Sequence, residues 1–492
     1  ARFTSVVNST TQLGYSLQYE KSSYSLVQGR GLAPFVEVAT GAATALPSSD
    51  SRGELSISGA YLQQNFKYKN HLFLTGAVRV DGSSVFGEDE RSQVYVKGSG
   101  SYVLSDAGYW GGSPISSWWN LFKLRLAYGE SGNLTGIGPY ERFNSYSSIA
   151  FLGKTSFFSS ATLANTRVKP ERQREIEFGT DLGFMDNRIG VQFNYYIKKV
   201  DDLLISRVIA PTTGFSSLLD NFGSLENKGF EVILNLGLVK RNDLRWELTG
   251  VFNRNRNKAV SIGQALTLLS TNAGAPIAIL EGQPIGVFYG TFFAVDPLKN
   301  TSGIPLTERG VQNSPLSYTT QRGADNLPSG AVLRKVIGDP NPDYTASLIN
   351  ELNYKKFNLR VQFDAVQGVD VFNADWRTRQ GVGNGKVAEQ EHRGELPRGY
   401  VLGVYNIEEW RVDDGSFVKL REVSIGYDFG RVKNIFSGLT VTLSGRNLVS
   451  FDDYKGYDPE VNSGGQSTIL RGVDFGSVPI PRTFSLGVQA KF

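Results

Sequence analysis

The chain contains no cysteine, one methionine and two histidines, and it has no long apolar run. Without cysteine there can be no disulfide, cysteine-bound zinc or cysteine nucleophile. His71 and His392 lie far apart in the sequence, so neither a histidine metal cluster nor a Ser-His-Asp triad is expected. No apolar run exceeds four residues, whereas a membrane-spanning helix needs about 20. We therefore expect no cofactor, no metal site and no catalytic residues.

An excess of charge of one sign is also missing. The 51 Lys and Arg residues nearly balance the 47 Asp and Glu residues, which leaves a net charge of +4 over 492 residues. No basic stripe results, so nucleic acid is not an expected partner. Disorder is excluded by the 40% hydrophobic content. Aromatic residues and glycine are abundant instead, with 30 Phe, 22 Tyr and 55 Gly, and this composition favours a large β protein.

Apolar and polar residues alternate along most of the chain, which puts them on opposite faces of a strand. The pattern is clearest in Thr483–Phe492 and in Phe357–Ala365. Strands of soluble sandwiches have about 5–6 residues, whereas many alternating stretches here reach the roughly ten that cross a bilayer. The sequence therefore predicts an all-β fold, a transmembrane antiparallel β-barrel with long extracellular loops. A soluble carbohydrate-binding β-sandwich is the alternative.

Fifteen strands are predicted from the alternation, and they are joined alternately by short and long connections. The strands cover about 10–20, 22–30, 54–68, 71–80, 92–104, 121–131, 172–184, 187–200, 226–239, 243–256, 342–354, 357–368, 416–429, 437–449 and 482–492. Tight turns are expected at 20–22, 68–70, 185–187, 240–243 and 355–356. Long connections are expected near 31–53, 132–171, 201–225, 369–415 and 450–481.

Two local features refine this prediction. In 257–341, Ile285–Val295 resembles a strand and would need a partner near 331–337, so fifteen or seventeen barrel strands are expected. The alternation also changes phase across Arg421 and Glu422, which indicates a β-bulge.

Six sequence blocks resemble the barrel of the SusC/RagA family of TonB-dependent outer-membrane transporters of Bacteroidetes, in the family's order. They are Arg79–Phe86 (RVDGSSVF), Leu124–Asn133 (LRLAYGESGN), Glu226–Glu231 (ENKGFE), Gly282–Gly290 (GQPIGVFYG), Gly338–Asp343 (GDPNPD), and Gly445–Leu448 (GRNL) followed by Tyr454–Pro459 (YKGYDP).

The resemblance implies that residues 1–492 are the C-terminal portion of a barrel of about 22 strands. The plug and the N-terminal extension of the family are not found in this chain, which starts at Ala1 without an initiator methionine or a signal-like segment. The chain is therefore expected to be processed or a fragment. Contact with TonB would come from the missing N-terminal region.

The resemblance also implies location in the cell outer membrane, with lipid against the apolar face. The implied function is TonB-dependent import of an oligosaccharide or oligopeptide substrate together with a SusD-like surface lipoprotein. The alternative is a SusC-like barrel that serves as a scaffold in an outer-membrane complex and transports nothing. A plug and a TonB box in the complete gene would favour transport.

Aromatic and arginine side chains in the 369–415 connection are the predicted ligand contacts, because rings stack on sugars and guanidinium groups bind hydroxyls or carboxylates. The alternative is that these side chains pack into a small core of the loop itself. The predicted contacts are Trp376, Arg377, Tyr405, Trp410 and Arg411.

The chain ends on an aromatic residue, Phe492, that closes an alternating strand. A C-terminal aromatic residue resembles the signal read by the outer-membrane assembly machinery. The alternative is that Phe492 is one more lipid-facing side chain.

Overall fold

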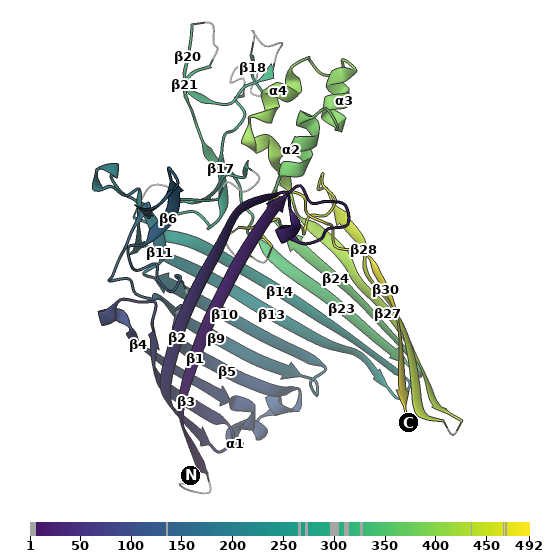
Figure 1. Ribbon diagram of the computed structural model, residues 1–492. Helices are drawn as coiled ribbons and strands as arrows, with labels where there is room; N and C mark the ends of the chain where they lie inside the picture. The colour runs from purple at the N-terminus through teal and green to yellow at the C-terminus, as the bar shows by residue number, and fades with distance from the viewer. Residues whose placement is uncertain are drawn as a thin grey trace. The chain divides into compact units, whose positions relative to one another are not determined.

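Most of the chain in the computed structural model is β-strand. The structure describes residues 6–133, 136–263, 267–270, 274–295, 305–308, 314–324, 328–433, 435–465, 467 and 470–492. The described residues form one sheet of fourteen strands (Figure 1). In sheet order these are β1 (Val7–Arg30), β2 (Thr44–Tyr68), β3 (Leu72–Ser83), β4 (Ser92–Val103), β5 (Trp119–Asn133), β9 (Glu171–Phe184), β10 (Ile189–Asp201), β13 (Ser224–Arg241), β14 (Leu244–Ser261), β23 (Tyr344–Tyr354), β24 (Phe357–Gln367), β27 (Phe417–Val432), β28 (Phe436–Asp452) and β30 (Thr483–Lys491).

The connections carry shorter strands and helices. The short strands are β6 (Tyr146–Phe151), β7 (Lys154–Ser159), β8 (Thr162–Leu163), β11 (Leu204–Val208), β12 (Ser217–Asn221), β15 (Thr267–Ser270), β16 (Ile277–Ile279), β17 (Val287–Gly290), β18 (Thr307–Glu308), β19 (Ser314–Pro315), β20 (Thr319–Arg322), β21 (Pro328–Val332), β22 (Lys335–Gly338), β25 (Asp370–Asn373), β26 (Val412–Asp414) and β29 (Val473–Asp474). The helices are α1 (Gly108–Gly111), α2 (Ala374–Gly381), α3 (Lys386–His392) and α4 (Tyr400–Tyr405), with 3-10 turns η1 (Ala39–Gly41), η2 (Glu88–Glu90), η3 (Leu104–Asp106), η4 (Pro114–Ser117), η5 (Pro211–Thr213) and η7 (Glu408–Arg411).

The predicted all-β antiparallel fold is confirmed, but the predicted count of fifteen or seventeen strands is wrong, because the sheet has fourteen within the described residues. The segments 10–20 and 22–30 are one strand, β1, which runs straight through the turn predicted at 20–22. There Lys21 pairs with Glu54 of β2, with 2.9 Å between Nζ and Oε1. The break in the alternation at 20–22 is therefore caused by polar residues within one long strand and not by a turn. The following connection is also shorter than predicted, since β2 begins at Thr44.

Three of the predicted hairpin turns contain residues with positive φ, which suit the turns of antiparallel hairpins. Lys69 and Asn70 have φ of 49° and 72°, and Lys355 has φ of 53°. Residues 185–187 likewise have φ between 53° and 59°. By contrast, no described residue between 20 and 30 has positive φ. All four remaining predicted turns join consecutive strands as expected, including 240–243, where no residue has positive φ.

The described residues of 257–341 contribute no strand to the large sheet beyond the end of β14. The expected pairing of the 285–295 segment with 331–337 does occur, since β17 pairs antiparallel with β22. However, this pair belongs to a separate four-stranded sheet with β15 and β16. The two predicted extra barrel strands are therefore part of a structured connection.

The predicted β-bulge is confirmed at Arg421. The pairing of β27 with both neighbours skips this residue, from Leu420 to Glu422. Its guanidinium group donates to Asp364 Oδ2 at 2.7 Å and to Asn447 Oδ1 at 2.8 Å. The bulge thus directs a charged side chain into a polar network.

Aromatic side chains form two rows across the strands of 189–197 and 226–492. One row runs from Phe193 through Phe230 and Phe252 to Tyr344, with 5.3–6.3 Å between neighbouring ring centroids. The other lies at the hairpin end, where the rings of Phe357, Tyr427 and Phe429 follow one another at 4.6–4.7 Å and Tyr354 pairs with Phe357. Tyr344 and Tyr354 are the first and the last of the eleven residues of β23. Ten steps of ~3.4 Å at a tilt of ~40° rise ~26 Å, close to the ~25 Å apolar band of outer-membrane barrels.

The chain divides into two compact units, Ala1–Tyr102 with Arg125–Glu177 and Lys198–Leu225, and Val103–Leu124 with Phe178–Ile197 and Glu226–Phe492. Each has a small apolar core in its connections. In the first unit the core includes Val85 and Phe86, and in the second it includes Phe288 and Phe372. The second core supports the candidate site.

Candidate functional site

The connection between β24 and β27 carries the helices α2, α3 and α4, which lie beyond the ends of these two strands (Figure 1). The helix α2 begins where Asn373 caps it, because the Asn373 Oδ1 accepts the Trp376 N–H at 2.9 Å. The Asn373 Nδ2 also donates to the buried carboxylate of Asp413 at 3.0 Å. The residue that caps α2 is therefore hydrogen-bonded to β26, the strand that follows the helices.

Side chains also position the two shorter helices. The Gln380 Oε1 accepts the N–H groups of Val387 and Ala388, at 2.9 and 3.1 Å, in the first turn of α3. The Glu391 carboxylate accepts the N–H groups of Gly399 and Val401, both at 2.7 Å, at the start of α4. A carboxylate is favourable at a helix N-terminus, where N–H groups lack helical partners. These bonds hold three short helices together.

Two glutamates join the helical segment to the four-stranded sheet. Glu408 accepts the Thr291 N–H at 2.8 Å and pairs with Arg334 at 3.0 Å. Glu409 accepts the Phe293 N–H at 2.8 Å and pairs with Lys335 at 3.1 Å. The connections 257–341 and 369–415 therefore form one folded layer in this unit.

The five predicted contact residues come together in this layer. The rings of Trp376 and Trp410 are 4.6 Å apart and tilted by 59°, and the ammonium of Lys455 lies 5.2 Å from the Trp376 ring. The guanidinium carbon of Arg377 lies 3.8 Å from the centre of the Tyr405 ring, a cation–π distance. The five residues therefore lie close together, as both a ligand site and a small core of the loop would require.

Arg411 is the most buried of the five, with 6% of its surface exposed. One of its Nη atoms donates to the Tyr405 carbonyl at 2.7 Å, and its guanidinium carbon lies 5.5 Å from the Phe372 ring. Burial, reinforced by the charge of Arg377, lowers the pKa of Arg411 to about 10. Nearby Glu408 opposes this shift. Arg411 remains cationic at neutral pH, at a cost in desolvation.

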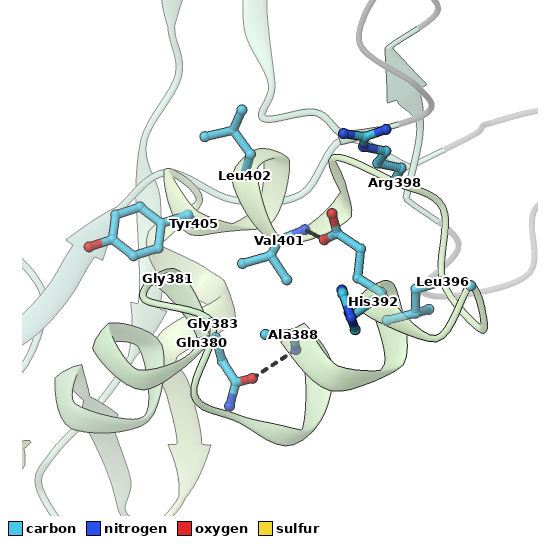
Figure 2. A pocket seen from close by; sticks show the side chains of 12 residues that line it. Gln380, Gly381, Gly383, Ala388, His392, Leu396, Arg398, Val401, Leu402 and Tyr405 are labelled. Carbon is cyan, nitrogen blue, oxygen red and sulfur yellow. Dashed lines mark hydrogen bonds between the residues drawn. The ribbon is translucent and has the colours of Figure 1, made fainter.

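A cavity of about 910 Å³ lies among the three helices (Figure 2). Tyr405 borders it on one side and His392 and Leu396 border it on the other. Its walls combine apolar and polar groups, as expected of a small-molecule site. The lining residues are Gln380, Gly381, Gly383, Ala388, Glu391, His392, Gly394, Leu396, Arg398, Val401, Leu402 and Tyr405.

The sequence prediction included Tyr405 but missed the other cavity residues. Trp376, Arg377, Trp410 and Arg411 do not line the cavity. The missed residues lie at the end of α2, on α3 and α4, and in the loops between these helices. Their only signal is a run of residues without the period-two pattern between Gln380 and Tyr405. No single residue type in that run indicates a cavity.

Phe492 lies at the end of the chain after β30, with 93% of its surface exposed, and its ring is 5.4 Å from that of Phe436. Its role as an assembly signal stays a prediction. Among the described residues, three or more metal-ligating side chains nowhere gather into a site. None of the helices in the described ranges has the length and apolar character needed to cross a membrane.

Comparison with known proteins identifies the fold. The family model "TonB dependent receptor-like, beta-barrel" matches residues 2–448. TonB-dependent receptor P3 of Formosa agariphila is 30% identical, over 97% of this chain and 50% of that protein. TonB-dependent receptor SusC of Bacteroides thetaiotaomicron is 24% identical, over 87% of this chain and 43% of that protein. The structure of the RagAB peptide importer in its "open-open" state matches with a TM-score of 0.80 and 19% identity, over all of this chain and 53% of that chain.

These matches confirm the resemblance to SusC and RagA. The chain spans about half the length of the curated relatives it matches. It belongs to the TonB-dependent receptor-like β-barrel family and is an outer-membrane barrel chain.

Proposed function

We propose that this chain is the C-terminal barrel portion of a TonB-dependent importer that takes oligosaccharides or oligopeptides across the outer membrane. In this proposal a SusD-like surface lipoprotein docks on the long connections and delivers the substrate. Coupling to TonB and gating by a plug would reside in parts of the protein outside these 492 residues. The activity would be transport and not catalysis.

One observation carries the proposal: the connection 369–415 is folded around a cavity of about 910 Å³ at the loop end of its strands. Long loops of outer-membrane barrels face the outside, where substrate arrives. The volume lies within the range of small-molecule sites, about 300–1,000 Å³. A further support is the curated relatives, which carry the name TonB-dependent receptor and are about twice as long.

The test is to replace residues 374–405 with a short Gly-Ser linker in the full-length protein, leaving β24 and β27 intact. Uptake of labelled oligopeptides and oligosaccharides is then measured in cells with equal amounts of protein in the outer membrane. We expect uptake of one class to be lost. Unchanged uptake of every substrate that the parent protein imports would contradict the proposed role of this segment.

A scaffold role makes a different prediction. If the barrel only supports a complex, deleting the full-length protein would disperse its partners without changing uptake of any oligomer. Measuring uptake and co-purification in the same strains therefore separates the two functions.

A further inference from the structure

Two arginines of the helical layer lie beside each other without a carboxylate partner in the described part of the chain. Arg377 belongs to α2 and is half-buried, and Arg411 belongs to η7 and is buried. No Asp or Glu among the described residues forms an ion pair with either guanidinium group. The Nε atoms of both are buried and have no hydrogen-bond acceptor there. Unsatisfied buried donors are rare in folded proteins and call for an explanation.

Three other cations of this layer are arranged differently. Arg334 pairs with Glu408, Lys335 with Glu409, and Arg393 with Glu389. This layer therefore has carboxylates available and uses them on other cations. Arg377 and Arg411 differ from these three cations, because neither has such a pair within the described residues and both guanidinium groups face one ring.

That ring belongs to Tyr405, whose centre lies 3.8 Å from the Arg377 guanidinium carbon and 5.8 Å from that of Arg411. Gly274 faces the same space, with φ of +73°. A Cβ atom added there would lie 3.5 Å from an Nη atom of Arg411 and 3.8 Å from one of Arg377. Gly274 is exposed and Arg377 is only half-buried, so the two arginines lie next to the protein surface.

We propose that Arg377 and Arg411 together bind a carboxylate of the imported ligand beside Tyr405. Each guanidinium presents a planar set of N–H donors that matches a carboxylate, and an anion would relieve the repulsion between the two cations. Because Tyr405 also lines the cavity, the remainder of the ligand would extend between α3 and α4. The inference rests on the proposed import function and specifies its substrate class as carboxylate-bearing oligomers.

Such a carboxylate has two sources, the free C-terminus of a peptide and a uronic acid in a glycan. The full-length protein is titrated by calorimetry with tetra-alanine and its C-terminal amide, and with tetragalacturonate and its methyl ester. We expect the acid of one pair to bind at least tenfold more tightly than its neutral form. Equal affinities within each pair, or binding of neither acid at millimolar concentration, would overturn the proposal.

Variants locate the binding to these arginines. Arg377→Gln should remove the preference for the acid, whereas Arg379→Gln should retain it. Arg379 lies on the same helix but against the ring of Tyr457, at 5.1 Å. A preference that survives Arg377→Gln would show that the carboxylate binds elsewhere, contrary to the proposal.

A second variant does not depend on removing an arginine. Gly274→Asp would place a carboxylate in the shared space, and aspartate tolerates the left-handed backbone better than most residues. We expect it to weaken binding of the acid at least tenfold more than Gly274→Asn, which has the same shape without the charge. Equal effects of the two substitutions would contradict an anion site.

Failure of this inference is distinguishable from failure of the import function. If cells with the parent protein take up an oligomer and the neutral form enters as well as the acid, only the carboxylate site is wrong. If no oligomer enters through the protein at all, the proposed function itself is wrong.

Discussion

At the scale of single residues, buried ion pairs hold the last long connection to the sheet. Lys419 of β27 has 5% of its side chain exposed and donates to Asp458 at 2.5 Å and to Glu460 at 2.7 Å. Asp458 also accepts the Ile480 N–H at 3.2 Å. One buried cation therefore orders both ends of the segment 458–480.

Replacing Lys419 with methionine should destabilise the protein strongly. The substitution leaves the Asp458 carboxylate buried without its cation, and breaking a buried pair costs about 3–5 kcal/mol. The measurement is the free energy of unfolding of the detergent-folded full-length protein. The matched control is Lys21→Met, because the Lys21–Glu54 pair is exposed and should matter little. Equal effects of the two substitutions would show that the buried Lys419 pair stabilises the protein no more than the exposed Lys21 pair does.

Tyr454 and Asp474 form a second buried contact, with a hydrogen bond of 2.8 Å from the Tyr454 hydroxyl to Asp474 Oδ2. Burial raises the pKa of Asp474, although this hydrogen bond acts to lower it. Asp375 adds to the rise and Arg379 opposes it. Because the pKa in the folded protein lies above that of the unfolded chain, the charged carboxylate costs stability, and this cost disappears as the pH falls through the raised pKa.

Tyr454→Phe should therefore destabilise the protein at pH 7 by about 1.5–3 kcal/mol, the range for a hydrogen bond to a charged group. The difference from the parent should shrink at acid pH. A protonated Asp474 carboxyl group is neutral, so the Tyr454 hydroxyl stabilises it less than it stabilises the carboxylate. Unfolding at pH 4 and pH 7 measures this difference. Tyr457→Phe in the same connection is the control, because Tyr457 is exposed. A loss that is the same at both pH values would contradict the role assigned to Asp474.

At the scale of elements, the helices α2, α3 and α4 depend on side chains that replace missing helical hydrogen bonds. Gln380 is buried and is the acceptor for the first turn of α3. Gln380→Ala should leave two N–H groups without that acceptor and loosen α3. We expect faster amide hydrogen exchange in residues 386–392 with little change in the strands. Gln390→Ala, for which the described structure has no side-chain hydrogen bond, should leave this exchange unchanged. Equal exchange in both variants would exclude the capping role of Gln380.

The strands could be predicted from the sequence because one face of the sheet is apolar and the other polar. Apolar and polar residues therefore alternate along each strand. The prediction failed where the pattern and the pairing differ. Glu20 to Ser22 break the alternation but lack the residues that favour positive φ, so β1 continues. In 257–341, the local signal of β17 was correct, yet it cannot reveal which sheet the strand joins.

The candidate site could be predicted only in part. Aromatic and arginine residues within a long polar connection indicated its location and included Tyr405. The cavity itself was not predictable, because it arises from the packing of three short helices whose capping contacts, such as Glu391 to Val401, join residues ten positions apart. That Arg411 has no carboxylate partner among the described residues likewise follows only from its surroundings in the folded protein.

At the scale of the whole molecule, the apolar face of the sheet should show the depth dependence of a membrane barrel. Leu443 lies near the middle of β28 and Phe451 near its loop end, and they are similarly exposed, at 56% and 59%. Leu443→Arg should cost about 2–4 kcal/mol of folding free energy in lipid vesicles, and Phe451→Arg about 0–1. The contrast arises because arginine near an end of the strand reaches the headgroups. Equal costs would place both residues at the same depth in the membrane. This result would contradict the expectation that β28 crosses the bilayer with Leu443 near its centre.

The central claim is that this chain is part of a TonB-dependent importer, and uptake in the absence of TonB tests it most directly. Cells that express the full-length protein are given labelled oligopeptides and oligosaccharides, with TonB present or deleted. The account predicts uptake of one class that requires both the protein and TonB. Protein-dependent uptake that continues unchanged without TonB, or no protein-dependent uptake of either class, would contradict it.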